Sequence, residues 1–281
     1  MNSTKHANMS QELSELESMA RHIRGRLVEM SHKAGTPHLG SSLSCVDILV
    51  AAYWRALSIH PKHPYAPDRD RFILSKGHAA TTLYVTLALR GFVPMELLDT
   101  YAEPGACVAE QPSPGCMPGV EVATGSLGHG LSVGLGMALA GRIQGHGYRV
   151  FVVMSDGECN EGSVWEAAMM TPAHRLDNLV AIIDFNKWQA TGRSNEVMAL
   201  HPLRQKWEAF GWSSYEVDGH DMAALVELLT NVPDSTGKPI AIVAHTVKGK
   251  GVPFMEDDNN WHYRIPTAQE VISAQNALGL L

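Results

Sequence analysis

The sequence predicts an α/β domain with a doubly wound, mostly parallel sheet and helices on both faces. Three continuous apolar runs alternate with helical stretches in the second half of the chain: 149–154, 179–184 and 239–246. Continuous apolar strands separated by helices indicate a parallel sheet that is covered on both sides. With 281 residues, of which 45% are hydrophobic, the chain can bury one large core. We see no internal repeats.

An apolar stripe at spacings of three and four predicts a helix near the N-terminus. Its members are Leu13, Leu16, Met19, Ile23, Leu27 and Met30. We expect Ser10 or Ser14 to cap this helix after a flexible segment, residues 1–12, and the Gly35-Thr36-Pro37 stretch to end it.

Further elements follow in order along the chain. A turn at Gly40-Ser41-Ser42 is expected to precede a helix over residues 44–56. Two Pro-rich stretches, 58–71 and 102–120, predict long functional or interface loops. Helices are expected over 126–142, where glycines would permit close packing, and over 161–175 and 221–230. We therefore place the domain at residues 13–270 and a C-terminal tail at 271–281.

Composition excludes several classes of function. The net charge is −7 and no Lys/Arg block is present, which argues against nucleic-acid binding. No apolar run approaches the roughly 18 residues that a membrane span needs, and the polar N-terminus does not resemble a signal peptide. The four cysteines (Cys45, Cys107, Cys116, Cys159) have no CxxC spacing, which is typical of a reduced, cytoplasmic protein.

Polar side chains follow two of the predicted strands at the point where each ends. Asp156 and Asn186 lie 30 residues apart, the length of one βαβ unit, so both should project from the carboxyl ends of parallel strands. Carboxylate, amide and main-chain carbonyl oxygens suit Mg²⁺, and Gly157 would let the backbone approach a phosphate. Either motif alone could be an ordinary turn after a buried strand, but the pair in this register favours a cofactor site.

These residues lie within segments that resemble the transketolase family. The Asp-Gly pair followed about thirty residues later by Asn resembles the thiamine-diphosphate fingerprint. The matching segments, in the family's order, are DRFILSKGHAATTLY (70–84), PGVEVATGSLGHGLSVGLGMA (118–138), SDGECNEGSVWEA (155–167) and VKGKGV…WH (247–262). The resemblance covers about residues 15–270 and implies the family's thiamine-diphosphate-binding domain, called the PP domain.

The resemblance implies roles for individual residues at the cofactor. Asp156, Asn186 and the carbonyl of Trp188 would hold the metal, with magnesium expected and calcium or manganese as alternatives. The diphosphate would contact Gly157, His78 and His262, with Lys248 nearby. The backbones of Gly125 and Leu127 would approach the aminopyrimidine.

It also implies roles near the substrate. His38 would lie by the reacting carbons with Ser41 close to it, and Glu161 would link two active sites across a dimer. For Glu161 the alternative is a charge favoured at a helix N-terminus. Any one of these histidines could be a surface or capping residue, and we interpret His129 as structural.

Two positions depart from the family pattern. Ser155 replaces the first glycine of the usual Gly-Asp-Gly, a small change that should be tolerated. Gln111-Pro112 stands where the family has a histidine before proline, a histidine that hydrogen-bonds the donor's hydroxyls. Glutamine can still donate and accept without carrying charge, so the usual ketose donors are in question.

The implied function is transfer of a two-carbon ketol unit from a ketose or ketose phosphate to an aldose. No segment resembles the family's pyrimidine-binding or C-terminal domain, so we expect a C-terminal transketolase subunit carrying the pyrimidine-binding domain as partner. The simplest assembly would be an α2β2 heterotetramer. The alternatives are an enzyme like deoxyxylulose-phosphate synthase or a ketoacid dehydrogenase, acting on a 2-oxo acid, and a non-catalytic cofactor-binding paralogue.

Overall fold

A five-stranded sheet forms the centre of the computed structural model, which describes residues 2–281, with side chains from residue 9 on. The strand order is β1-β2-β3-β7-β6 and every neighbouring pair is parallel. The strands are β1 (Arg71–Leu74), β2 (Val150–Ser155), β3 (Leu179–Phe185), β6 (Ser213–Asp218) and β7 (Ile240–His245). The predicted fold class is confirmed, and β2, β3 and β7 are the three predicted strands.

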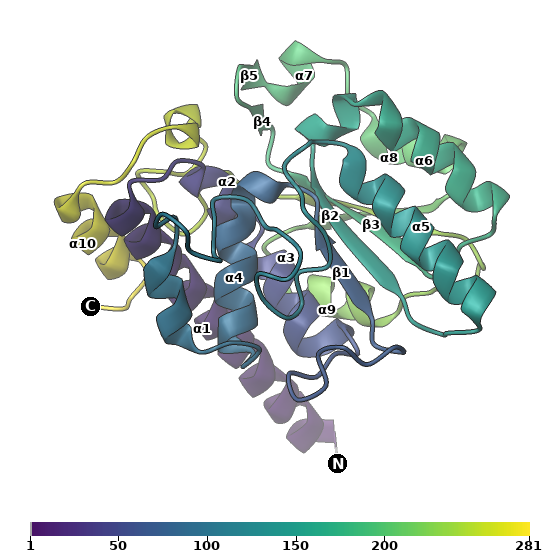
Figure 1. Cartoon of the computed structure of the whole chain (residues 1–281), viewed down its shortest axis with the longest axis horizontal. Helices are drawn as coiled ribbons and strands as arrows, with labels where there is room; N and C mark the ends of the chain where they lie inside the picture. Colours follow the sequence, from purple (N-terminus) through teal and green to yellow (C-terminus); the bar gives the residue numbers. More distant parts are fainter. Residues whose placement is uncertain (1) are drawn as a thin grey trace.

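Helices cover both faces of this sheet (Figure 1). One layer contains α1 (Asn2–Ala34), α2 (Leu39–Ser44), α3 (Val46–Ala51), α4 (Ala80–Leu89) and α9 (Met222–Thr230). The other contains α5 (His129–Gln144), α6 (Gly162–Ala173) and α8 (Leu203–Ala209). Alternate side chains of β2 enter the two layers, Phe151 and Val153 on one side and Val152 on the other, as the period of a strand requires.

Short elements complete the chain. They are η1 (Ala52–Ala56), η2 (Gly77–Ala79), η3 (Met95–Thr100), η4 (Gly157–Asn160), β4 (Trp188–Gln189), β5 (Gly192–Arg193), α7 (Ser194–Val197), η5 (Asn259–His262) and α10 (Ala268–Ala277). Within the described residues, no helix is both long enough and apolar enough to cross a membrane.

The N-terminal predictions need two corrections. Helix α1 begins at Asn2, so Ser10 and Ser14 lie inside the helix and do not cap it. The flexibility of residues 1–12 stays a prediction, and residue 1 lies outside the described residues. The Gly40-Ser41-Ser42 turn was also wrong, because these residues belong to helix α2. Gly40 serves packing, since a Cβ there would lie 3.1 Å from Lys248 Cγ.

The C-terminal residues are structured. Residues 271–281, which we placed in a tail, contain most of α10, and this helix packs on α1. Thr267 and Glu270 form a capping box at its start, and Gln275 donates to the Gly25 carbonyl at 3.1 Å. The domain boundaries at residues 12 and 270 stay predictions.

The Gly-rich helix α5 packs closely on the sheet, as its composition predicted. A Cβ on Gly134 would lie 2.6 Å from Val152 Cγ2, whereas a Cβ on Gly136 would meet no atom within 4 Å. The two glycines therefore have opposite environments on the same helix. Gly134 is needed because β2 leaves no room for a side chain, whereas Gly136 faces open space.

Gly134→Ala should destabilise the fold by about 1–3 kcal/mol through overpacking. Gly136→Ala is the matched control and should stabilise it by about 0.5–1 kcal/mol, because alanine has the higher helix propensity. Urea unfolding of the two variants checks this. Equal midpoints would show that α5 does not need the close approach at Gly134.

Candidate functional site

A cavity of about 430 Å³ opens at the carboxyl ends of the central strands. It lies where open α/β sheets bind ligands, and its size suits a small molecule. Its lining includes His38, Ser41, His78, Gln111, Gly125, Leu127, Asp156, Gly157, Glu161, Asn186, Trp188 and His262. The structure thus brings together all the predicted site residues except Lys248, which lies directly behind His262.

Asp156 and Asn186 follow neighbouring parallel strands, because Ser155 pairs with Asp184 in the sheet register. Asp156 is fully buried, and both of its carboxylate oxygens accept hydrogen bonds. Oδ1 accepts from the Gly157 amide at 2.9 Å, and Oδ2 accepts from the Lys187 amide at 2.9 Å and from Ser194 Oγ at 2.7 Å. The carboxylate is therefore held in one orientation.

The turn between Asn186 and Trp188 has an unusual backbone. Lys187 has φ 71°, in the left-handed region that non-glycine residues rarely adopt. The turn lets the Trp188 amide donate to Asn186 Oδ1 at 3.1 Å while the Lys187 amide reaches Asp156. Local backbone strain of this kind is typical of functional sites.

This set of donors fits a hard cation. Burial raises the pKa of Asp156 to about 7, and nearby Asp184 also raises it, so the site favours an added positive charge. The described residues contain no group of three or more His, Cys, Asp or Glu side chains placed to hold a metal. A cation here would need the amide and carbonyl oxygens as well, together with phosphate oxygens, the mixture that Mg²⁺ takes.

Three histidines form one wall of the cavity. The ring centroids of His38 lie 5.4 Å from His78 and 4.9 Å from His262, and those of His78 and His262 lie 6.1 Å apart. Burial lowers the pKa of all three, and that of His262 falls to about 3 with a further contribution from Lys248. The rings are therefore neutral near pH 7, and each can both donate and accept a proton.

Lys248 positions one of these rings from behind. Its Nζ contacts Asn259 Oδ1 at 2.7 Å and His262 Nδ1 at 3.1 Å. An ammonium group can only donate, so Nδ1 of His262 accepts and the ring proton sits on Nε2. Burial and the nearby Lys76 lower the pKa of Lys248 to about 8.

Gln111 and Gly125 are in close contact at the cavity. A Cβ on Gly125 would lie 1.9 Å from Gln111 Oε1, and Gly125 has φ 130°, so only glycine fits here. Glu161 is exposed at the start of α6, where it makes no capping hydrogen bond from its side chain. It lies against Gly128, whose added Cβ would be 2.6 Å from Glu161 Cβ.

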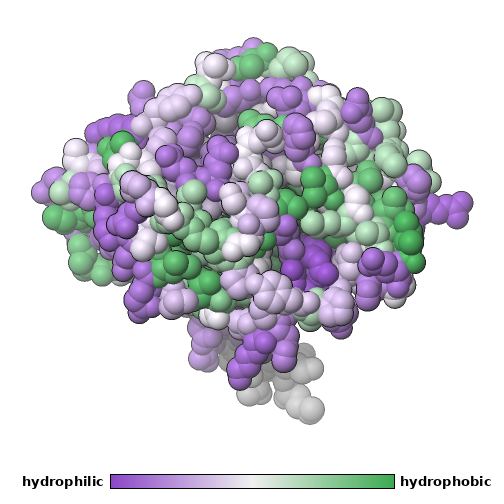
Figure 2. All heavy atoms as spheres, in the orientation of Figure 1, coloured by the Kyte–Doolittle hydropathy of each residue, from purple (hydrophilic) through white to green (hydrophobic). Residues whose placement is uncertain are grey.

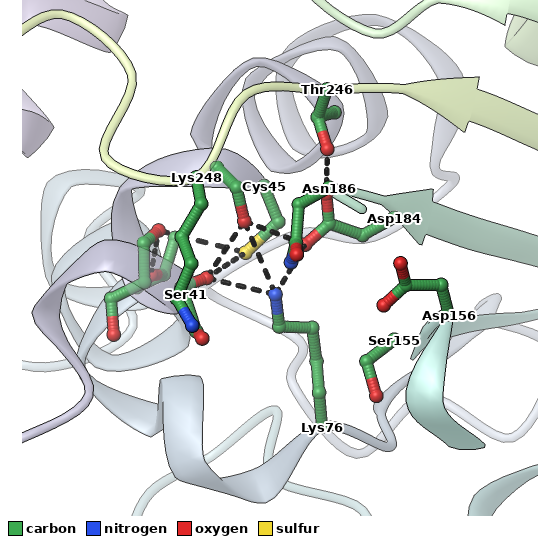
Figure 3. A network of polar contacts seen from close by, with 12 residues as sticks. Ser41, Cys45, Lys76, Ser155, Asp156, Asp184, Asn186, Thr246 and Lys248 are labelled. Atoms are coloured by element: carbon green, nitrogen blue, oxygen red, sulfur yellow. Dashed lines mark hydrogen bonds and ion pairs between the residues drawn. The ribbon is translucent and has the colours of Figure 1, made fainter. Parts of the chain in front are cut away.

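A buried ion pair beneath the cavity was not predicted (Figure 3). Lys76 Nζ contacts the Asp184 carboxylate, and both side chains are 0% exposed. Lys76 also donates to the Ser41 carbonyl at 2.8 Å, while Asp184 accepts from Ser44 Oγ at 2.7 Å and from the Thr246 hydroxyl. Burial acts to raise the pKa of Asp184, but Lys76 outweighs it and the pKa is lowered. The two residues are 108 positions apart in the sequence, so no local pattern points to the pair.

Glu158 is a second buried group that sequence reasoning missed. Its carboxylate accepts from the Ser75 hydroxyl, from the Gly128 amide at 3.0 Å and from the Ser155 amide at 2.9 Å. Burial raises its pKa despite these hydrogen bonds. Glu158 therefore ties the ends of β1 and β2 to the start of α5, next to the cavity.

Comparison with known proteins relates this site to one family. Residues 16–281 match the family described as transketolase, thiamine diphosphate binding domain. The chain is 44% identical over 255 residues to an apulose-4-phosphate transketolase subunit of Phocaeicola vulgatus, and the match covers 91% of this chain and 90% of that protein. It is 41% identical over 248 residues to a 6-deoxy-6-sulfo-D-fructose transketolase subunit of Clostridium sp. (strain MSTE9), covering 88% and 90%.

A solved structure of a longer protein contains the same architecture. The transketolase of Campylobacter jejuni superposes with a TM-score of 0.89 at 28% sequence identity, and the match covers 94% of this chain. The chain spans 42% of the length of that protein.

Lys76→Met should destabilise the fold by about 3–5 kcal/mol, because it leaves Asp184 buried and unpaired. Lys76→Met combined with Asp184→Asn should recover part of this loss. Arg204→Ala breaks the exposed Arg204–Glu208 pair and serves as the control, at a cost below about 0.5 kcal/mol. Urea unfolding measures all three. If Lys76→Met costs no more than Arg204→Ala, the buried pair is not structural.

Proposed function

The chain belongs to the transketolase family, and we propose that it is the thiamine-diphosphate-binding subunit of a two-chain transketolase. It would transfer a two-carbon ketol unit from a ketose or ketose phosphate to an aldose. The observation that carries this proposal is the convergence of Asp156, Asn186 and three neutral histidines on one cavity. Relatives named as transketolase subunits match the chain over 90% of their own length, which supports the two-chain arrangement.

Asp156, Asn186 and the Trp188 carbonyl would hold Mg²⁺, and Gly157 would let the main chain come close to the cofactor's diphosphate. The raised pKa of Asp156 supports this assignment, because a bound cation would stabilise the ionised carboxylate. His78 and the Nε2–H of His262 would donate to the diphosphate oxygens. When bound, the cofactor supplies the nucleophilic carbon and electron sink for breaking and forming a carbon–carbon bond.

The chain's own residues would then handle protons and orientation. The ring centroid of His38 lies 4.9 Å from that of His262. Because its lowered pKa keeps His38 neutral, it can accept a proton from a substrate hydroxyl and return it. Gln111, which also lines the cavity, would hydrogen-bond the donor's hydroxyls. Gly125 and Leu127 would present their main chains to the aminopyrimidine, and Ser41 would lie beside His38. Glu161, exposed at the start of α6, would connect two sites across an assembly.

We propose a C-terminal transketolase subunit with the pyrimidine-binding domain as partner, in an α2β2 assembly located in the cytoplasm. The relatives are themselves named as subunits of transketolases, which supports a partner. Apolar side chains also reach the surface on the α5 and α6 side of the molecule (Figure 2), among them Val133, Ile143, Met169 and Met170. Such a surface suits an obligate interface of above roughly 2,000 Å² in total.

The test is reconstitution. This chain, purified with Mg²⁺ and thiamine diphosphate, should show no ketol transfer alone and should become active when the second subunit is added. Ketose donors should be turned over and pyruvate should not. Robust transfer by the chain alone would contradict the two-chain proposal, and turnover of pyruvate would favour the 2-oxo-acid alternative.

Asp156→Ala should abolish Mg²⁺-dependent binding of thiamine diphosphate in calorimetry and leave the far-UV spectrum unchanged. Asp177→Ala is the control, because Asp177 is a partly exposed carboxylate just before β3, at the opposite end of the sheet. It should bind cofactor like the wild type. Unchanged cofactor affinity in Asp156→Ala would remove this residue from the metal site.

Gln111→His should shift relative kcat/KM toward ordinary ketose phosphates, since only contacts that differ between competing transition states change specificity. Ser113→His is the control, because it adds the same ring at an exposed position of the same loop. A donor profile identical in wild type and Gln111→His would show that residue 111 does not contact the donor.

A further inference from the structure

Two cysteines flank the part of the chain that brings Gln111 to the cavity. The segment between η3 and α5 has no helix or strand and passes in front of α4 (Figure 1). We call residues 107–116 of this segment the Gln111 loop. Cys107 is exposed at one end and Cys116 is partly exposed at the other, whereas Cys45 and Cys159 are buried.

The Gln111 loop is anchored at both ends and at Pro112, whose carbonyl accepts from the Thr124 amide at 3.4 Å. Val108 and Met117, each next to one of the cysteines, are buried in the core on the α1–α4 side. The Ala102 amide donates to the Val108 carbonyl at 2.9 Å, which holds the first end. Between them, residues 109–115 are exposed except for Pro112. The two cysteines therefore lie where the loop leaves the core.

The two cysteines are in contact. Cys107 Sγ donates to the Cys116 carbonyl oxygen at 2.6 Å, which places this sulfur against the main chain of Cys116. Local burial raises the pKa of Cys107, and the neighbouring Cys116 thiol raises it further. The Cys107 sulfur therefore lies against the residue that carries the second thiol.

We propose that Cys107 and Cys116 are a reversible dithiol that hydrogen peroxide converts to an intraloop disulfide. One thiolate attacks the peroxide, the O–O bond breaks, and a sulfenic acid and water form. The second thiolate then attacks that sulfur, the S–S bond forms, the S–O bond breaks, and the hydroxide leaves as water. The two thiols are oxidised and the peroxide is reduced to two waters. A small dithiol reverses the change. Disulfides of this reversible kind are compatible with a reducing compartment.

The disulfide would act on the cavity through Gln111. Bond formation draws the two sulfurs to about 2 Å, so the exposed part of the loop must shift. Gln111 Oε1 lies directly against Gly125, and Glu110 acts to raise the pKa of His38, so a shift of this loop alters both contacts at the substrate side of the cavity. This consequence rests on the proposed function, whereas the disulfide itself does not.

The chemical step is tested by peptide mapping of the native chain after hydrogen peroxide treatment. No Lys or Arg lies between residues 91 and 141, so trypsin leaves both cysteines on one peptide. Cleavage after Glu110 separates them, so only a disulfide keeps the two peptides together. We expect this linked pair, with the mass lower by two hydrogen atoms, and its release by dithiothreitol. Cys45 and Cys159 should remain reduced and serve as internal controls.

Cys107→Ser and Cys116→Ser are the matched variants, and neither should form the linked peptides. In the reconstituted enzyme, oxidation should lower donor kcat/KM by about tenfold in the wild type, as the loss of one hydrogen bond predicts, and not in either variant. Cofactor affinity should stay the same. Separate oxidation of the two thiols, cross-linking to Cys45 or Cys159, or an unchanged donor kcat/KM in the cross-linked enzyme would each overturn the proposal. Absence of transfer in the reduced enzyme would instead count against the proposed function, and the peptide map would still decide on the disulfide.

Discussion

The arrangement of the segments around the cavity depends on the buried ion pair between Lys76 and Asp184. A charge without a partner in a protein interior is costly, so the segments that carry and surround the pair must meet in one arrangement. Lys76 follows β1, Asp184 lies in β3, Thr246 follows β7, and Ser41 and Ser44 come from α2. Four segments from distant parts of the chain thus meet at this ion pair. Asp184 is two residues before Asn186, so the pair also fixes the start of the proposed metal-site turn.

The same pair determines the electrostatics of the site above it. Lys76 is buried and charged, and with burial it contributes to the low pKa values of His78 and His262. Lys248 adds to this effect from the other side. The result is a cavity with neutral imidazoles over fixed positive charge, next to a carboxylate that burial holds at a high pKa. An anionic ligand together with a divalent cation satisfies both halves of this arrangement.

Features that leave a local pattern in the sequence were predicted, and features that join residues far apart in the sequence were not. Strands β2 and β3 are buried throughout and β7 is buried except at its last residue, so continuous apolar runs revealed them. By contrast, β6 is a partly exposed edge strand and β1 has only four residues. Asp156 and Asn186 were found because strand ends locate them. The partnership of Lys76 with Asp184 spans 108 residues and leaves no local pattern. Gly40-Ser41-Ser42 has the composition of a turn, but it is helical, and Gly40 is needed for packing on Lys248.

The left-handed backbone of Lys187 affects which residues position 187 tolerates. An L-residue there costs about 1–2 kcal/mol relative to the right-handed conformation. The lysine side chain is exposed, while its amide holds Asp156. A saturation library at this codon should therefore be ordered by φ tolerance, with Gly and Asn enriched and Val and Ile depleted, independently of charge. Asn186 and Trp188 on either side line the cavity, whereas residue 187 would be under selection for its main-chain conformation alone.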